Sequence, residues 1–236
     1  MRIFVYGSLA YDRIMDFPGR FKDHILPKQI HKLNVSFLVQ EFNEGFGGAG
    51  GNIAYNLSLL GEQPLLYGAV GRDFISYAEH FENLDLRGVK VYQNDLTASA
   101  YIITDKDDNQ ITGFFPGAMR YHGRKPDFKS GDFLIIAPGN SLEMLDLAEA
   151  AVAKKIPFIF DPGQQIIQFT KSQLQQALKK AAIFIVNDYE KVLTEKITGY
   201  GSELLLKNAG IFITTLGSKG SEIELADNGR TQRFKI

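Results

Sequence analysis

The sequence predicts an α/β fold with a mostly parallel central sheet, helices on both faces and a small second sheet. Six short runs are apolar throughout rather than alternating, which is typical of strands buried on both faces. Helical segments fall between most of these runs, as in parallel sheets. The six expected strands are Ile3–Tyr6, Leu65–Val70, Phe133–Ala137, Ile156–Phe160, Ile183–Val186 and Ile211–Thr215.

Three of the intervening helices have recognisable ends. Residues 52–60 stop at Gly61 and residues 188–198 stop at Gly199, because glycine commonly ends a helix. Asn140, with Glu143 three residues later, can cap a third helix, which ends in the basic pair 154–155.

Two stretches break the buried-strand pattern. Residues 33–39 alternate between apolar and polar side chains, which predicts a half-exposed strand. Residues 98–104 and 110–115 flank the polar tract 105–109 and predict a hairpin. We expect a separate antiparallel sheet that forms a lid over the ligand, from about residues 13–46 and 97–118 of a single domain. The alternative is an edge meander of the main sheet.

Composition excludes several classes of protein. Of 236 residues, 44% are hydrophobic and 22% charged, as in ordinary globular domains, and the formal charge of −1 shows no basic excess that would suggest a nucleic-acid surface. The chain has no cysteine, so thiolate chemistry and disulfides are excluded. No apolar stretch approaches the roughly 20 residues that span a bilayer. We expect a cytoplasmic enzyme with no membrane or nucleic-acid partner.

Polar or small residues follow the buried strands where a ligand would bind. Within two residues after four of them come Ser8, Asp161, Asn187 and Gly217. Ligands of parallel α/β sheets bind at the carboxyl ends of the strands. The sequence therefore predicts a ligand site at this edge.

A glycine-rich turn spans residues 45–52, before a helix. Its glycines let the backbone approach a ligand, although a tight strand-to-helix turn would also explain them. Gly45, Gly47 and Gly50 match G-x-G-x-x-G, with Asp73 23 residues beyond, so a nicotinamide dinucleotide enzyme is an alternative. That fingerprint should follow a buried parallel strand, whereas the strand expected here alternates. No P-loop sequence occurs.

Four motifs occur in the order of one known family. Residues 47–61 resemble the N-terminal signature of the ribokinase-like (phosphofructokinase-B type) carbohydrate and nucleoside kinases. Residues 7–12 look like the family's first-strand motif, residues 187–190 like its N-x-x-E motif, and residues 214–220 like its nucleotide-binding turn. The resemblance covers the whole chain and is greatest to adenosine-kinase-like members. It implies a ribokinase-like three-layer α/β/α fold with a β-sheet lid.

The resemblance also implies an activity and its residues. It implies transfer of the γ-phosphate of ATP to a hydroxyl of a nucleoside or sugar, with adenosine or a ribose-like substrate favoured. The substrate residues would be Ser8, Asp12, Gly47, Gly48 and Asn52; the ATP residues Asn187, Thr215, Gly217 and Gly220; and Glu190 would organise Mg²⁺, through water. Each has a plainer alternative, such as a helix cap for Asn52 or for the pair Asn187 and Glu190.

One family motif is not found in this sequence. The family's catalytic base is the aspartate of a Gly-Ala-Gly-Asp motif near the C-terminus, whereas residues 48–50 here are followed by Gly51. Residues 227–229 predict a hairpin turn, and the return strand 231–236 ends on an apolar residue. We expect the catalytic aspartate beyond Ile236. The alternative is a non-catalytic relative that binds a sugar or nucleoside. A homodimer could form through an exposed lid strand such as residues 33–39.

Overall fold

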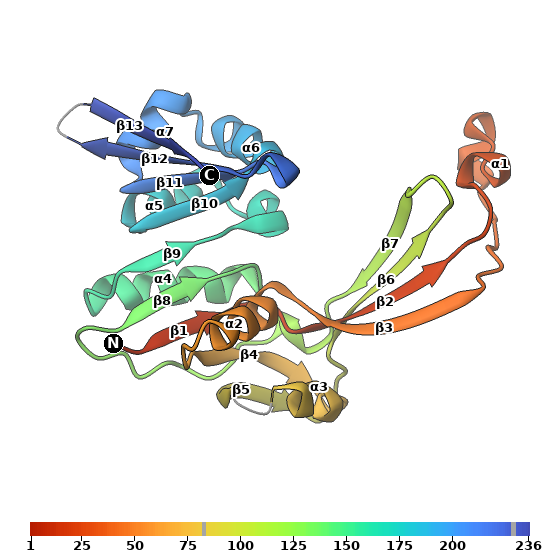
Figure 1. Ribbon diagram of the computed structural model, residues 1–236, viewed down its shortest axis with the longest axis horizontal. Helices are drawn as coiled ribbons and strands as arrows, with labels where there is room; N and C mark the ends of the chain where they lie inside the picture. The colour runs from red at the N-terminus through yellow and green to blue at the C-terminus, as the bar shows by residue number, and fades with distance from the viewer. Residues whose placement is uncertain (82–83, 228–229) are drawn as a thin grey trace.

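The computed structural model describes residues 1–81, 84–227 and 230–236 and contains two sheets. The larger has nine strands in the order β13-β12-β11-β10-β9-β8-β1-β4-β5, and the smaller has four in the order β3-β2-β6-β7 (Figure 1). The small sheet is thus separate from the central one, and the edge-meander alternative is wrong.

The central sheet is parallel from β5 to β11 and antiparallel beyond. All six predicted strands are confirmed, with bounds that agree within about two residues. The sequence prediction had left out β5. The turn predicted at residues 227–229 falls partly outside the described residues, but its two flanking strands form. The strands are β1 (Ile3–Tyr6), β4 (Leu65–Gly71), β5 (Asp85–Tyr92), β8 (Phe133–Ile136), β9 (Phe158–Phe160), β10 (Ile183–Asn187), β11 (Ile211–Thr215), β12 (Ser221–Asp227) and β13 (Arg230–Lys235).

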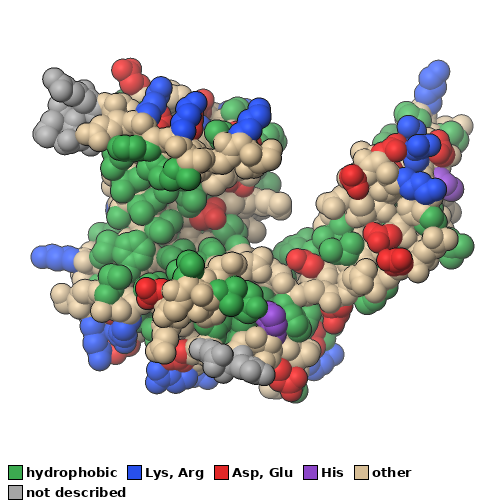
Figure 2. All heavy atoms as spheres, viewed as in Figure 1, with side chains coloured by type: hydrophobic (Ala, Val, Ile, Leu, Met, Phe, Trp, Pro, Cys, Tyr) green, Lys and Arg blue, Asp and Glu red, His purple; other side chains and the backbone are tan. Residues whose placement is uncertain are grey.

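Helices cover the two faces of the central sheet unequally. On one face, α4 (Ser141–Ala153), α5 (Lys171–Lys180), α6 (Asp188–Thr198) and α7 (Ser202–Asn208) pack around buried strand residues such as Phe4 and Phe184. On the other, α2 (Ala49–Leu59) and α3 (Ile75–His80) cover Val5 and Leu66. The row that continues from Val5 runs through Ile135, Ile159, Ile183 and Ile211, which are only half-buried. Figure 2 shows hydrophobic side chains gathered on this face.

The predicted helix ends are confirmed. Asn140 Oδ1 accepts hydrogen bonds from the backbone N–H groups of Leu142 and Glu143, and Gly199 ends α6 at a φ of 70°. The Glu143 carboxylate, however, accepts from the Gly123 N–H at 2.7 Å rather than completing a capping box. Among the described helices, none combines the length and the apolar character needed to cross a membrane.

The small sheet confirms the predicted hairpin but corrects two other expectations. Its strands are β2 (Ala10–Asp16), β3 (Glu41–Gly47), β6 (Ala98–Thr104) and β7 (Gln110–Phe115). Because β2 pairs in parallel with β6, the sheet is mixed rather than antiparallel.

Residues 33–39 do not form the predicted strand, because the chain there has no ladder partner. Its alternation is nevertheless real: Val35, Phe37 and Val39 are half-buried while the residues between them are exposed, and Phe37 packs against Phe17 and Phe21. An extended chain alternates its side chains with or without hydrogen-bonded neighbours. Residues 21–32 form the short helix α1 (Phe21–His24) and a 3₁₀ segment, Pro27–Lys32, at the far end of the small sheet.

Candidate functional site

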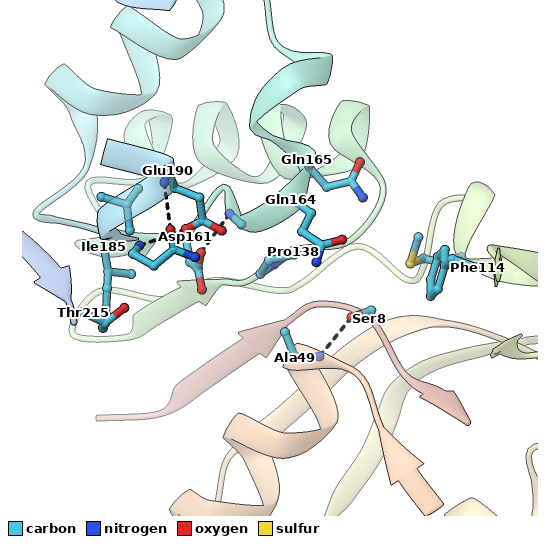
Figure 3. Close-up of a pocket in the computed structure, with 14 residues that line it drawn as sticks. Ser8, Ala49, Phe114, Pro138, Asp161, Gln164, Gln165, Ile185, Glu190 and Thr215 are labelled. Carbon is cyan, nitrogen blue, oxygen red and sulfur yellow. Dashed lines mark hydrogen bonds between the residues drawn. The ribbon is translucent and has the colours of Figure 1, made fainter. Parts of the chain in front are cut away.

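A cavity of about 490 Å³ lies at the carboxyl ends of β1, β8, β9, β10 and β11, the edge predicted from the sequence (Figure 3). The projecting small sheet borders it through Phe114. Figure 2 shows the open hollow between this sheet and the central body. The cavity is lined by Ser8, Ala49, Phe114, Met119, Pro138, Asp161, Gly163, Gln164, Gln165, Ile185, Val186, Asn187, Glu190 and Thr215.

One end of the cavity carries two neighbouring carboxyl groups, those of Asp161 and Glu190. Asp161 Oδ1 accepts a hydrogen bond from the Gly163 N–H at 2.9 Å. Glu190 Oε2 accepts from the Asn187 N–H at 2.9 Å, and Asn187 Oδ1 accepts from the Glu190 N–H at 2.7 Å. Burial and, to a smaller extent, the nearby Glu190 carboxyl group together raise the pKa of Asp161 to about 7.

These two carboxyl groups fit a hydrated divalent cation. Within the described residues, no group of three or more metal-ligating side chains is found. Magnesium usually keeps several waters and takes one or two carboxylates, so a pair of carboxyl groups matches its needs. A cation beside Asp161 and Glu190 would also relieve the repulsion between them.

Asn187 and Glu190 have a structural role as well. Their reciprocal hydrogen bonds form a capping box at the start of α6. The helix-cap alternative for this pair is therefore confirmed, and the cavity position adds to it rather than replacing it. The capping box uses one oxygen of the Glu190 carboxylate and leaves the second, Oε1, as a candidate cation ligand.

The other end of the cavity is apolar. Phe114, Met119 and Pro138 line it, and the Phe114 side chain is half exposed. The exposed carboxamide of Gln164 lies above this end and points towards the small sheet (Figure 3). A flat group could lie against these apolar side chains while its edge forms hydrogen bonds with the amide.

Ser8, which follows β1, is hydrogen-bonded to the N-terminus of α2. Its Oγ accepts from the Ala49 N–H at 3.0 Å, and its carbonyl accepts from the N–H groups of Gly50 and Gly51 at 3.0 and 3.2 Å. The first N–H groups of α2 are thus paired within the chain instead of facing a ligand. The hydroxyl hydrogen of Ser8 can still be donated into the cavity.

The glycines of the turn have packing reasons within the chain. A Cβ on Gly47 would overlap the Asp12 carboxylate, one on Gly51 would overlap the Tyr77 hydroxyl, and one on Gly50 would lie 2.8 Å from the backbone of Gly7. Gly48 has a φ of 90°, which favours glycine. The tight-turn interpretation therefore accounts for these residues.

The dinucleotide interpretation is wrong. Gly45 and Gly47 belong to β3, an edge strand of the small sheet, rather than to a turn that follows a buried parallel strand.

The structure brings together only some of the predicted site residues. Ser8, Asn187, Glu190 and Thr215 line the cavity, and Asp12, Gly47, Gly48, Asn52, Gly217 and Gly220 are outside its lining.

Asp12 nevertheless faces the cavity side of the small sheet. It pairs with Ala100, which pairs with Phe114, so Asp12 and Phe114 share a row and a face. Burial raises the pKa of Asp12, and its carboxylate lies against Gly47.

Asn52 is exposed on α2, and Gly48 takes the N-cap position, so the prediction that Asn52 caps this helix is wrong. Gly217 and Gly220, at φ values of 59° and 84°, form the turn that follows Thr215.

Sequence reasoning assigned no role to two residues of the cavity, Asp161 and Gln164. The sequence places Asp161 at the ligand edge of the sheet but indicates no partner for it. Its separation of 29 positions from Glu190 hides their proximity, which arises because β9 and β10 are adjacent and parallel. Gln164 carries no pattern that a single sequence could reveal.

Comparison with known proteins identifies the family. The model of the pfkB family carbohydrate kinases matches residues 2–231. The chain belongs to this family. The predicted resemblance and the ribokinase-like fold are therefore confirmed.

The most similar proteins found include nucleoside kinases. The chain is 31% identical over 200 residues to the nucleoside kinase of Methanocaldococcus jannaschii, which covers 82% of this chain and 66% of that protein. It is 30% identical over 199 residues to the nucleoside kinase of Methanothermobacter thermautotrophicus, covering 80% and 64%. The matched region thus spans a little less than two thirds of these relatives.

Solved structures of nucleoside kinases are also similar to this chain. The nucleoside kinase of Burkholderia thailandensis in complex with inosine has a TM-score of 0.85 and 34% identity, over 99% of this chain and 75% of that one. The M. jannaschii nucleoside kinase has a TM-score of 0.85 and 27% identity, over 100% and 75%.

Proposed function

We propose that this chain transfers the γ-phosphate of ATP to a hydroxyl of a nucleoside, with Mg²⁺ at Asp161 and Glu190. The observation that carries the proposal is the chemical difference between the two ends of the cavity. One end offers carboxyl groups, and the other offers apolar side chains and an amide. A nucleoside next to a nucleotide phosphate has the same distribution of polar and apolar groups.

The polar end suits the phosphates. The two carboxyl groups would bind the hydrated cation, which would neutralise charge on the phosphates as they react. Asn187 and Thr215 lie beside them and would bind the nucleotide, together with the backbone N–H groups of the turn at Gly217 and Gly220. Phosphoryl transfer depends mainly on such positioning and charge stabilisation.

The apolar end favours a nucleoside over a free sugar. Phe114 and Met119 would lie against the base, and the Asp12 carboxylate, on the same face as Phe114, would accept hydrogen bonds from two ribose hydroxyls. The Gln164 amide both donates and accepts hydrogen bonds, and a rotation of 180° exchanges its oxygen and nitrogen. It therefore suits a 6-amino and a 6-oxo purine equally. We therefore extend the expected substrate from adenosine to inosine, the ligand of the similar B. thailandensis structure.

We also propose that the small sheet, about residues 13–46 and 97–118, is a lid that excludes water from the reaction.

The homodimer expected through residues 33–39 loses its basis, because these residues form no strand. The edge strands of the small sheet are β3 and β7, and self-association would use one of them. Sedimentation of the protein over a range of concentrations tests this self-association.

The assay for the activity is ADP release with adenosine, inosine, ribose and fructose 6-phosphate. It compares residues 1–236 with a version extended to the length of the relatives, because the catalytic base is expected beyond Ile236. Turnover with nucleosides by the extended version is the expected result. Inosine binding with no ADP release by either version would favour the non-catalytic alternative, and neither binding nor turnover would refute the proposal.

A further inference from the structure

One attachment of the small sheet to the central body is the segment of residues 71–77, which runs from the last residue of β4 into α3. The Tyr11 hydroxyl of β2 donates to the Asp73 carbonyl at 2.7 Å. Just before β6, the Thr97 N–H donates to Asp73 Oδ1 at 2.7 Å, and Thr97 Oγ1 accepts from the Gly71 N–H at 3.0 Å. Two of the four strands of the small sheet are therefore bonded to this segment.

A third strand, β3, is held by Tyr77. The Tyr77 hydroxyl donates to the carbonyl of Gly47, the last residue of β3, at 2.5 Å. Gly51 leaves the space that the hydroxyl occupies. The Tyr77 ring also packs against Phe46 of β3 and Tyr11 of β2, with centroids 4.9 and 5.8 Å apart. The same segment therefore holds β3 by a hydrogen bond and by aromatic packing.

The fourth strand, β7, is attached beside the same place. The Ala118 N–H donates to the Leu96 carbonyl at 2.8 Å, and the Arg120 guanidinium donates to Asp95 Oδ2 at 2.9 Å. Asp95 is in turn bonded to the segment, because its carbonyl accepts from the Arg72 N–H at 3.0 Å. Residues 71–77 thus contact β2, β3 and the residue before β6, and they are linked through Asp95 to the segment that follows β7.

Burial makes these attachments difficult to replace with water. Thr97, Tyr77 and Tyr11 are 0%, 1% and 2% exposed. A buried carbonyl or N–H group that loses its partner stays unpaired, which is costly. Tyr77 also bears on the substrate side, because Gly47, the residue it holds, packs against the Asp12 carboxylate.

We propose that Asp73 and Tyr77 are positioning residues that set the orientation of the small sheet relative to the central sheet and, through Gly47, the place of Asp12. These roles in orienting the small sheet do not depend on the proposed kinase activity. Only the effect on nucleoside binding rests on the proposed function.

The chain has no cysteine, so the orientation can be measured with two introduced labels. We would place spin labels at Lys106→Cys, in the hairpin turn between β6 and β7, and at Lys154→Cys, at the end of α4; both positions are exposed. Tyr77→Phe and Asp73→Ala should broaden or shift the distribution of distances between the labels. Asp73→Asn, which keeps an acceptor oxygen for the Thr97 N–H, should restore it.

The matched control is Tyr92→Phe. It removes a hydroxyl that donates to the His122 carbonyl at 2.8 Å. The Tyr92 backbone pairs with Gly71, but this hydroxyl bond joins no residue of the segment or of the small sheet, so the distances should stay unchanged. In calorimetry, inosine should bind Tyr77→Phe about threefold to tenfold more weakly. This is the loss expected if a displaced Asp12 carboxylate loses one hydrogen bond to the nucleoside. ADP affinity should not change.

Unchanged distances in folded Tyr77→Phe and Asp73→Ala would overturn the inference, as would an equal change in Tyr92→Phe. If the parent protein binds no nucleoside, the proposed function fails while the label distances still decide the positioning roles. Thermal melting of each variant confirms that it is folded. If Asp73→Ala does not fold, Tyr77→Phe alone decides.

Discussion

The close approach of α2 to β1 predicts an unusual response to Gly50→Ala. Alanine is favoured over glycine by about 1 kcal/mol in a helix interior, and Gly50 is the second residue of α2, so this substitution would ordinarily stabilise the protein by up to that amount. Here the new Cβ would lie 2.8 Å from Cα and the carbonyl carbon of Gly7, and 2.9 Å from its nitrogen. These are backbone atoms of the strand end, and the Gly7 N–H is itself bonded to Tyr67.

The expected magnitude follows from two opposing effects. Overpacking costs about 1–3 kcal/mol, and against a backbone held in place the upper part of that range applies. After the helix-propensity gain, we expect Gly50→Ala to lower the free energy of unfolding by about 1–2 kcal/mol. For a chain of this size, the melting temperature should fall by roughly 2–8 °C.

Urea denaturation followed by far-ultraviolet circular dichroism would measure the change, since the chain has no tryptophan to serve as a fluorescent probe. The control is Gly45→Ala in β3, where the nearest atom to a new Cβ, the Asp12 carbonyl oxygen, is 4.0 Å away. We expect this variant to stay within about 0.5 kcal/mol of the parent. If Gly50→Ala were as stable as the parent or more so, α2 would not approach β1 as described.

Four further predictions concern the cavity. Because burial and Glu190 raise the pKa of Asp161 from 3.8 to about 7, its ionisation opposes folding, and the stability it contributes when protonated is lost as pH rises through about 7. Asp161→Asn should therefore melt higher than the parent above this pH, with the difference vanishing below the ordinary aspartate pKa; an equal difference at all pH values would contradict this. Added MgCl₂ should raise the melting temperature of the parent but not of Asp161→Asn or Glu190→Gln, and CaCl₂ serves as a comparison. Asn187→Ala should lower the free energy of unfolding by about 1 kcal/mol in urea titrations, because α6 loses its cap, and no loss would argue against the capping box. Gln164→Leu should weaken inosine binding in calorimetry more than ribose binding. Equal weakening would show that the nucleobase does not bind beside Gln164.

The buried strands could be predicted from the sequence because their pattern is local. Ile211–Thr215 and Ile183–Asn187 are apolar on both faces and flanked by polar or small residues, and both strands form within one residue of the predicted bounds. Residues 33–39 show the limit of the same reasoning. Their alternation follows from an extended chain packed on one side, and a ladder partner is a tertiary fact that alternation does not encode.

Much of the site could not be predicted for a similar reason. Asp161 and Glu190 belong to different strand-to-helix turns, and only the parallel pairing of β9 and β10 places them in one cavity. Tyr77 and Asp73 likewise act on strands far away in sequence. Asn187 and Glu190, by contrast, lie three residues apart, so the resemblance to the N-x-x-E motif indicates their role and their spacing at a helix start indicates the capping box.

The glycine-rich turn links fold and site through Ser8. If its glycines existed only for a ligand, the α2 N–H groups would be free, yet Ser8 accepts three of them. The end of β1 is therefore fixed to the start of α2 before any ligand binds. Because β2 follows β1 directly, and Gly47 leaves room for the Asp12 carboxylate, the same close approach also fixes where that carboxylate stands. The glycines thus serve the substrate side indirectly: they let three backbone segments meet, and the meeting places Asp12 on the face of the small sheet that borders the cavity.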